Sequence, residues 1–313
     1  MDEWLAIAFS DQLKEGDFRG VEVLGKEILI GRSREIFALD NRCPHRGGKL
    51  SSGRMKDARI VCPYHGWEYD INGRLSIIPS TRLKPPGISL RRYEIKESLG
   101  IIWIKIGNPI YDVSSFFPEY TNSNFRKISC GPYIFKNSAP RVVENLIDVS
   151  HFPYVHSGLL GDLRFTEVPD YDVQLGKEGV IADNIKVWQP NPDGLIQGKW
   201  VTYKYKVPRP FLVYFSKNDS SKIFSMFFSV TPISEDESLV LAFIAMNYAY
   251  DVPEEKIRGF EDEVMKQDMK VLEDEEPKYL PLDLKKEIHC PADKASIYYR
   301  TWLKELGIDC CVK

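Results

Sequence analysis

Short apolar runs broken by turn residues fill the first part of the chain. Runs of this length, rich in β-branched and aromatic residues, predict strands; they cover residues 20–25, 27–33, 35–40, 58–70, 73–80 and 99–107. Asn72-Gly73, between two of the runs, predicts a hairpin with a type I′ turn, which needs a positive φ at both central residues. Residues 1–110 are therefore expected to form a small all-β domain, and a looser segment containing Pro and Ser follows it.

The pattern changes after residue 110. Apolar positions within 141–158 recur at helical spacing and predict a helix that runs until Pro153 bends or ends it. Strand-like runs then predict a curved antiparallel sheet; they cover residues 171–176, 179–188, 199–207, 211–216, 222–231 and 239–250. Two more helices are expected, over 253–276, which has a proline and acids in its first turn, and over 296–307. Residues 111–313 are thus predicted to form a second domain, and the chain as a whole to be α+β.

Charge and composition narrow the classes of function. The net charge is −3, the isoelectric point is about 6.0, and basic residues are scattered, so no nucleic-acid partner is expected. The first residues include acids where a secretion signal would have basic residues, and no window reaches eighteen consecutive apolar residues. Neither secretion nor membrane insertion is therefore expected. We expect a cytoplasmic location. Six cysteines are too sparse for a disulfide scaffold, and those close to histidines suggest metal. Cys310 and Cys311 are assigned no role.

Two mixed motifs, Cys43-Pro-His45 and Cys62-Pro-Tyr-His65, supply two thiolates and two imidazoles from two turns. Such a set suits either zinc or a [2Fe–2S] cluster. A zinc finger of the Cys₂His₂ type pairs Cys with Cys and His with His. Here each motif holds one of each, as expected when each turn gives one ligand to each of two irons. The spacing therefore favours the cluster, and a zinc knuckle is the alternative.

A second set of histidines, His151 and His156, follows the first predicted helix. Positions i and i+5 lie about 140° apart on an ideal helix, so the two side chains share a metal only if the chain bends, and Pro153 supplies a bend. Asp148, three residues before His151, would lie on the same helical face and orient its ring.

Two histidines and one carboxylate make the facial triad of non-haem Fe(II) oxygenases. In the helix over 253–276 an apolar stripe is expected at Ile257, Phe260, Val264 and Val271. Asp268 falls within the stripe, where a carboxylate is costly unless it is paired or binds metal. Glu261 is the alternative ligand, nearer the start of the helix, where solvent exposure is easier.

These motifs resemble those of Rieske-type ring-hydroxylating oxygenases. "CPHRG" and "CPYHGW" are similar to their cluster motif, "ENLIDVSHFPYVH" to their mononuclear-iron motif, "QDMKVLEDEEP" to the segment with their iron-binding Asp, and "ADKASIYYRTWLKEL" to their closing helix. The resemblance implies a Rieske domain over 1–110 and a catalytic domain of the helix-grip, START-like type over 111–313. It implies cluster ligands at Cys43, His45, Cys62 and His65, iron ligands at His151, His156 and Asp268, a bridging aspartate at Asp148, and a polar residue beside the iron at Asn145.

The same resemblance implies a terminal oxygenase of the EC 1.14 class that uses O₂ and mononuclear Fe(II). No GxGxxG signature occurs, so electrons from NAD(P)H are expected through a separate reductase, possibly with a ferredoxin. The compact second domain favours hydroxylation or demethylation of a small aromatic or cyclic compound over ring dioxygenation. Alternating aromatics in 199–207 and 222–230 either line a pocket or belong to the sheet core.

The expected assembly is a homotrimer, and the resemblance implies that His65 of one subunit meets Asp148 of the next. Such a head-to-tail contact must close into a ring or form filaments. The alternative function is a Rieske electron-transfer or redox-sensing protein whose second domain only binds a ligand. It predicts about two irons per chain, against about three for the oxygenase.

Overall fold

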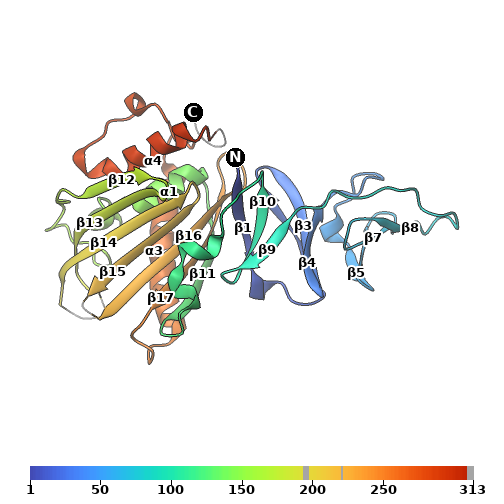
Figure 1. Cartoon of the computed structure of the whole chain (residues 1–313), viewed down its shortest axis with the longest axis horizontal. Coiled ribbons are helices and arrows are strands. Elements are labelled where there is room, and N and C mark those ends of the chain that lie inside the picture. Colours follow the sequence, from blue (N-terminus) through green and yellow to red (C-terminus); the bar gives the residue numbers. More distant parts are fainter. Residues whose placement is uncertain (193–196, 220, 309–313) are drawn as a thin grey trace. The chain divides into compact units, whose positions relative to one another are not determined.

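The computed structural model describes residues 1–192, 197–219 and 221–308. The chain divides into two compact units, Asp2–Ile110 and Tyr111–Lys313 (Figure 1). None of the helices within the described ranges is both long and apolar enough to cross a membrane.

The first unit consists of three small antiparallel sheets. One has the order β1 (Glu3–Phe9), β10 (Ile101–Ile106), β9 (Ile95–Ser98); the second contains β2 (Phe18–Val23), β3 (Lys26–Ser33) and β4 (Glu35–Asp40); the third contains β5 (Arg54–Lys56), β6 (Arg59–Val61), β7 (Glu68–Asp70) and β8 (Leu75–Ile77). Two 3₁₀ turns, η1 (Ser10–Gln12) and η2 (Leu50–Ser52), connect strands. The predicted all-β character is confirmed. Strands β1, β5 and β9 were not predicted; every residue of β1 is buried, so it lacks the alternation of a half-exposed strand.

The predicted hairpin forms between β7 and β8, but its turn is not type I′. Of the two central residues only Gly73 has a positive φ, 85°. The side chain of Asp70 accepts hydrogen bonds at 2.9 Å from the backbone N–H groups of both Asn72 and Arg74. Gly73 N–H donates to the Asp70 carbonyl oxygen over 2.9 Å. These contacts stabilise a longer loop that ends in a left-handed glycine, a common hairpin alternative.

The second unit is built on one seven-stranded antiparallel sheet of order β11-β17-β16-β15-β14-β13-β12 (Figure 1). The strands are β11 (Arg126–Phe135), β12 (Asp172–Gly176), β13 (Gly179–Gln189), β14 (Lys199–Arg209), β15 (Leu212–Asp219), β16 (Lys222–Pro232) and β17 (Ser238–Met246). Strand β11 was not predicted, because Gly131-Pro132 interrupts its alternation where the register with β17 shifts. The predicted antiparallel sheet with helices is confirmed.

Among its described residues the unit has four helices: α1 (Ala139–Ile147), α2 (Phe152–Val155), α3 (Glu254–Asp274) and α4 (Lys294–Glu305). Helix α1 contacts β15 to β17, α3 contacts β11, and α4 contacts β12 and β13. Short 3₁₀ turns η3 (Val113–Phe116), η4 (Pro118–Thr121), η5 (Leu284–Lys286) and η6 (Pro291–Asp293) complete the unit. Phe117, between η3 and η4, stacks on Phe227 of β16 with ring centroids 5.4 Å apart. The central strands are therefore buried on both faces, which explains their nearly continuous apolar sequences.

The prediction of one helix reaching Pro153 was wrong. Helix α1 ends at Ile147, and Asp148 already has an extended backbone. One carboxylate oxygen of Asp148 accepts hydrogen bonds from the backbone and the hydroxyl of Ser150, at 2.8 and 2.7 Å. This local turn competes with helix continuation. Pro153 instead lies in the first turn of α2, where its missing N–H costs nothing.

The buried face of α3 is rotated from the predicted stripe. Its buried residues are Glu261, Val264, Met265, Asp268 and Leu272. Phe260 and Val271 are 43% and 47% exposed, so the prediction that they belong to the buried stripe was wrong. The expectation that Glu261 is more easily exposed was also wrong, since only 7% of this residue is accessible. Asp268 is buried, as the stripe predicted.

Candidate functional site

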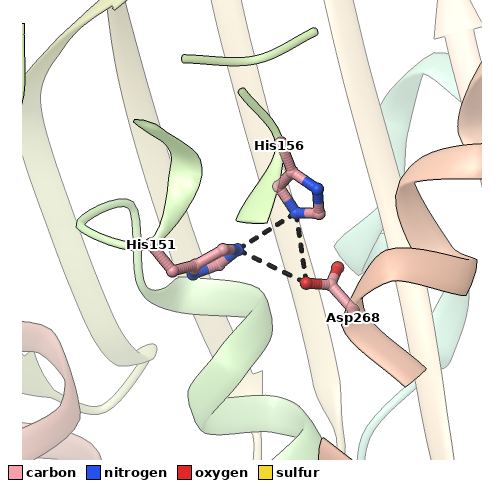
Figure 2. A group of neighbouring side chains, drawn as sticks. All are labelled: His151, His156 and Asp268. Atoms are coloured by element: carbon pink, nitrogen blue, oxygen red, sulfur yellow. Dashed lines mark hydrogen bonds and ion pairs between the residues drawn. The ribbon is translucent and has the colours of Figure 1, made fainter. Parts of the chain in front are cut away.

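His151, His156 and Asp268 point their side chains toward one another (Figure 2). The Nε2 atoms of the two histidines lie 3.2 Å apart. The Asp268 Oδ1 atom lies 3.4 Å from Nε2 of His151 and 3.1 Å from Nε2 of His156. The turn after α1 and the short helix α2 position the imidazoles, and α3 positions the carboxylate. Three donor atoms from two distant parts of the sequence therefore meet at one point.

The other nitrogen of each imidazole has an oxygen partner. Nδ1 of His151 lies 3.0 Å from Oδ2 of Asp148, and Nδ1 of His156 lies 2.8 Å from Oε1 of Gln267. Acceptors at Nδ1 favour the tautomer whose Nε2 lone pair faces the shared point. Asp148 thus contacts His151 as predicted, but through a turn rather than along a helical face. Gln267 was not predicted; its one signal in the sequence is its position next to Asp268.

Asn145 lies in the last turn of α1, beside the same group. Its Nδ2 atom is 3.4 Å from Oδ1 of Asp268. Its Oδ1 atom is buried and has no hydrogen-bond partner within the described residues. Buried polar atoms in native proteins are nearly always satisfied, so an unpartnered one indicates a group that belongs there when the site is filled.

The charges of the three converging side chains are strongly linked. Burial alone would lower the pKa of His151, but Asp148 and Asp268 raise that pKa to about 9. Burial would raise the pKa of Asp268, but the two histidines hold it below its usual value. The group therefore favours positive charge at its centre, as a divalent cation supplies. Two imidazole nitrogens and one carboxylate fit mononuclear Fe(II).

The four residues of the Cys/His motifs lie in two loops of the first unit. Cys43 and Cys62 are buried, whereas His45 is half-buried and His65 is exposed. The imidazole centroids of the two histidines are 4.5 Å apart, and His45 stacks on Trp67 at 4.4 Å. Thiols therefore lie on the inner side and imidazoles on the outer side of the two loops.

The two loops are closed by the same backbone pattern. Cys43 N–H donates to the Gly48 carbonyl oxygen at 2.9 Å, and Cys62 N–H donates to that of Trp67 at 2.8 Å. Gly47 and Gly66 occupy equivalent positions with φ of 70° and 68°, which favour glycine. A Cβ atom on Gly48 would lie 3.1 Å from the Cys62 sulfur, so a larger residue would crowd the space beside the thiols.

The donor set of these loops fits a cluster better than one zinc ion. Among His, Cys, Asp and Glu residues in the described ranges, only the His151 group brings three donor atoms within 4.8 Å of one another. Donors on one tetrahedral zinc, at about 2.0–2.3 Å from the metal, lie closer together than that. In addition, Nδ1 of His45 is buried without a partner within the described part of the chain. Cysteines inside and histidines outside match the two differently ligated irons of a Rieske cluster.

A cavity of about 450 Å³ adjoins the His151 group, a size suited to a small organic molecule. Aromatic side chains of the sheet line it, namely Tyr203, Tyr205, Phe215, Phe224 and Phe228. Several of the alternating aromatics in 199–207 and 222–230 therefore line a pocket. Three further charged side chains line the cavity: Lys217 from β15, and Lys256 and the buried Glu261 from α3.

Two family models match the chain. Residues 3–93 match the Rieske [2Fe-2S] domain, and residues 135–308 match the vanillate O-demethylase oxygenase C-terminal domain. Methylxanthine N1-demethylase NdmA of Pseudomonas putida is 30% identical over 91% of this chain and 82% of its own length. Methylxanthine N3-demethylase NdmB of the same organism is 28% identical over 92% of this chain and 83% of its own length.

Solved structures agree with these matches. The structure of Pseudomonas putida CBB5 NdmA with caffeine aligns with a TM-score of 0.78 and 26% identity, over 97% of this chain and 90% of that one. Dicamba monooxygenase bound to dicamba shares the fold, with a TM-score of 0.78 at 20% identity over 97% and 96% of the two chains. The demethylases among these relatives support the oxygenase prediction over the electron carrier. The chain therefore belongs to the Rieske non-haem iron oxygenases, as a terminal oxygenase component that uses a [2Fe–2S] cluster, mononuclear iron, O₂ and electrons from NAD(P)H through a separate reductase.

Proposed function

We propose that this oxygenase removes a methyl group from a ring nitrogen or oxygen of a small cyclic compound. The observation that carries the proposal is the aromatic cavity beside the His151 group. The similarity to N-demethylases and to an O-demethylase domain supports it. The balanced reaction takes substrate methyl, O₂, two electrons and two protons to the demethylated substrate, formaldehyde and water.

The ligands are assigned as the sequence predicted. His151, His156 and Asp268 would hold the mononuclear iron, and the predicted Cys and His residues of the two loops would hold the cluster. When bound, these groups supply the electron transfer and the activation of O₂. Asp148 fixes the ring of His151 through its Nδ1 atom. Asn145, which contacts Asp268 and has an unpartnered carbonyl oxygen, would face the space beside the iron.

The cavity wall positions the substrate. Tyr203, Phe215 and Phe228 offer ring faces against which a planar molecule stacks, and their burial excludes water from the methyl group being oxidised. Tyr203 is held by a hydrogen bond of 2.7 Å from Gln189 to its hydroxyl. A rigid wall of this kind keeps one methyl group near the iron site and the others away from it.

The working assembly is inferred to be a homotrimer in the cytoplasm, with electrons entering from a separate reductase, with or without a ferredoxin. His65 is exposed on its loop, and the Asp148 side chain is 26% exposed although both its oxygens are hydrogen-bonded. Both side chains are thus accessible for the contact between neighbouring subunits that the family resemblance implies. That contact would link a cluster ligand to an iron ligand through Asp148.

The test of this function is stoichiometric. The purified chain, loaded with iron and supplied with NADH and a surrogate reductase, is screened against N- and O-methylated ring compounds. We expect one compound to give equal amounts of formaldehyde and demethylated product, with matching O₂ uptake. Hydroxylated product without formaldehyde would show a hydroxylase instead, and NADH oxidation with no oxygenated product from any compound would count against the proposal.

A further inference from the structure

Glu261 lies on the buried face of α3, two helical turns before Asp268. Only 7% of its surface is exposed, and it lines the same cavity as Asp268. Seven residues of helix span about 10 Å along the axis, roughly the length of a fused bicyclic ring. The iron site and Glu261 therefore lie along the same wall of the cavity, separated by about the length of such a molecule.

Glu261 makes no hydrogen bond or ion pair within the described ranges of the chain. A buried carboxyl group without a partner destabilises a fold, because it loses its hydration and gains nothing in exchange. A molecule in the cavity is the partner that its position allows. The unpartnered carboxyl group then lowers the stability of the protein without ligand, as functional groups in binding sites often do.

Burial and the neighbouring charges determine whether the Glu261 carboxyl group is protonated. Burial, and to a smaller extent the charges of Asp268 and Asp262, raise the pKa of Glu261 to about 8, although Lys217 opposes the shift. Lys217 is itself held on the opposite wall, because its Nζ atom donates to the Pro192 carbonyl oxygen at 3.0 Å and to Gln189 Oε1 at 3.3 Å. At neutral pH the carboxyl group of Glu261 is therefore mostly protonated.

A protonated carboxyl group presents one O–H donor and one carbonyl acceptor side by side. The complementary edge is a carbonyl oxygen next to an N–H, as in a lactam or cyclic imide. An aromatic carboxylate matches only half of this pair, because it can accept the O–H of Glu261 but offers no N–H to the Glu261 carbonyl oxygen. A lactam or imide edge matches both halves.

We propose that Glu261 is a specificity-determining residue that pairs through its carboxyl group with the lactam or imide edge of a neutral heterocyclic substrate, while the aromatic side chains of the sheet hold the ring. The proposal rests on the proposed function, since it names the class of substrate that the same cavity takes. It also assigns a direction to the bound molecule: the hydrogen-bonding edge lies at Glu261 and the methyl group to be removed lies toward Asp268.

The test uses a matched pair of probes, theobromine and caffeine. Theobromine has an N–H between two carbonyl groups, and caffeine carries a methyl group on that nitrogen. Equilibrium binding is measured by calorimetry on the iron-loaded protein without reductase, so that no turnover is needed. Theobromine should bind about tenfold more tightly than caffeine, the value of one or two buried hydrogen bonds. Glu261→Leu should abolish this preference, and Glu261→Gln should keep it, because an amide also offers a donor beside an acceptor.

A second measurement separates recognition from a structural role. Glu261→Leu removes an unpartnered buried acid, so its thermal midpoint should rise while its affinity for theobromine falls. A residue needed only for folding would lower both. Asp262→Asn is the matched control, because Asp262 accepts a hydrogen bond at 2.6 Å from the Tyr133 hydroxyl and does not line the cavity; it should leave the preference intact.

Three results would overturn the proposal: equal affinities of the wild-type protein for the two xanthines, tighter binding of vanillate than of theobromine, or failure of theobromine and of 2-pyridone to bind at millimolar concentration. These results are independent of the formaldehyde assay. A protein that demethylates another compound but fails the binding test retains the proposed function and loses only the role of Glu261. One that passes the binding test but releases no formaldehyde loses only the demethylation.

Discussion

The Oε1 atom of Gln267 lies 2.8 Å from Nδ1 of His156. Because an amide oxygen only accepts hydrogen bonds, His156 must carry its proton on Nδ1 and present a lone pair at Nε2. Gln267 thus accepts a hydrogen bond from Nδ1 of His156, as Asp148 does from Nδ1 of His151. The two supports differ in charge, so the site has one anionic and one neutral partner behind its imidazoles.

Replacing Gln267 with Leu should weaken iron binding about 10- to 100-fold, the usual effect of losing a partner behind a metal ligand. Iron content after dialysis against a graded chelator series measures this. Gln267→Glu, which keeps an acceptor oxygen at the same place, is the matched control and should retain most of the metal. Unchanged iron affinity in Gln267→Leu would mean that the ring of His156 is fixed by packing alone.

Replacing Asp268 with Ala should remove the mononuclear iron and leave the cluster. Metal analysis should then fall from about three to about two irons per chain, with the visible spectrum of the cluster unchanged. Substrate-dependent O₂ consumption should disappear. Full turnover by this variant would identify another acid as the ligand, and a parallel loss of both iron types would point to misfolding.

Thermal unfolding at several pH values reports on Glu261. Its pKa in the folded protein, about 8, lies above the ordinary value of 4.5, with burial as the largest cause. The stability of the wild-type protein relative to Glu261→Gln should therefore be highest below about pH 4.5 and fall as the pH rises toward 8. Asp262, Asp268 and Lys217 remain in both proteins. In metal-free samples the unfolding free energies should diverge by on the order of 3 kcal/mol between pH 5 and 8; parallel curves would show an exposed carboxylate.

The site residues that could be predicted from the sequence are those that can be recognised from their near neighbours along the chain. Cys43-Pro-His45 and its partner motif show their mixed spacing within four residues, and His151 and His156 lie in one short segment. Asp268 was detectable because a carboxylate within an apolar stripe is unusual. The strands with alternating patterns were equally visible, whereas β1, buried throughout, was not.

The features that the sequence analysis missed depend on the exact rotation of α3 about its axis and on side chains that form hydrogen bonds in place of continued helix. Whether Glu261 or Phe260 faces the sheet is a matter of one residue, about 100° of rotation, and the stripe could not decide it. The helix break at Asp148 arises because one side chain binds Ser150 rather than leaving the backbone to continue. Gln267 acquires its role only through contact with a histidine 111 residues away.

A buried ion network ties α1, which carries Asn145, to α4. Arg300 binds Glu144 at 2.6 and 2.7 Å and Glu287 at 2.5 Å, and its side chain is 4% exposed. Arg300→Met should destabilise the protein by about 1.5–3 kcal/mol, the value of hydrogen bonds to charged groups, because Glu144 and Glu287 lose one of their two arginines and keep only Arg141. Chemical denaturation measures this. Lys136→Met, which breaks the more exposed pair with Glu237, should leave the midpoint nearly unchanged.

The proposed trimer predicts that two inactive variants of the chain restore activity when they are mixed. If the cluster of one chain feeds the iron of its neighbour, a Cys43→Ser chain and a His151→Ala chain should each be inactive, because each lacks one of the two iron centres. Mixed trimers contain some neighbours in which an intact cluster faces an intact iron site, so activity should reappear once subunits exchange. Differently tagged chains and a pull-down establish that exchange took place, and an Asp148→Leu change placed on the Cys43→Ser chain should prevent the recovery, since that chain supplies the iron site. Exchange without recovery, or a fully active monomer in sedimentation, would show that electrons pass within one chain.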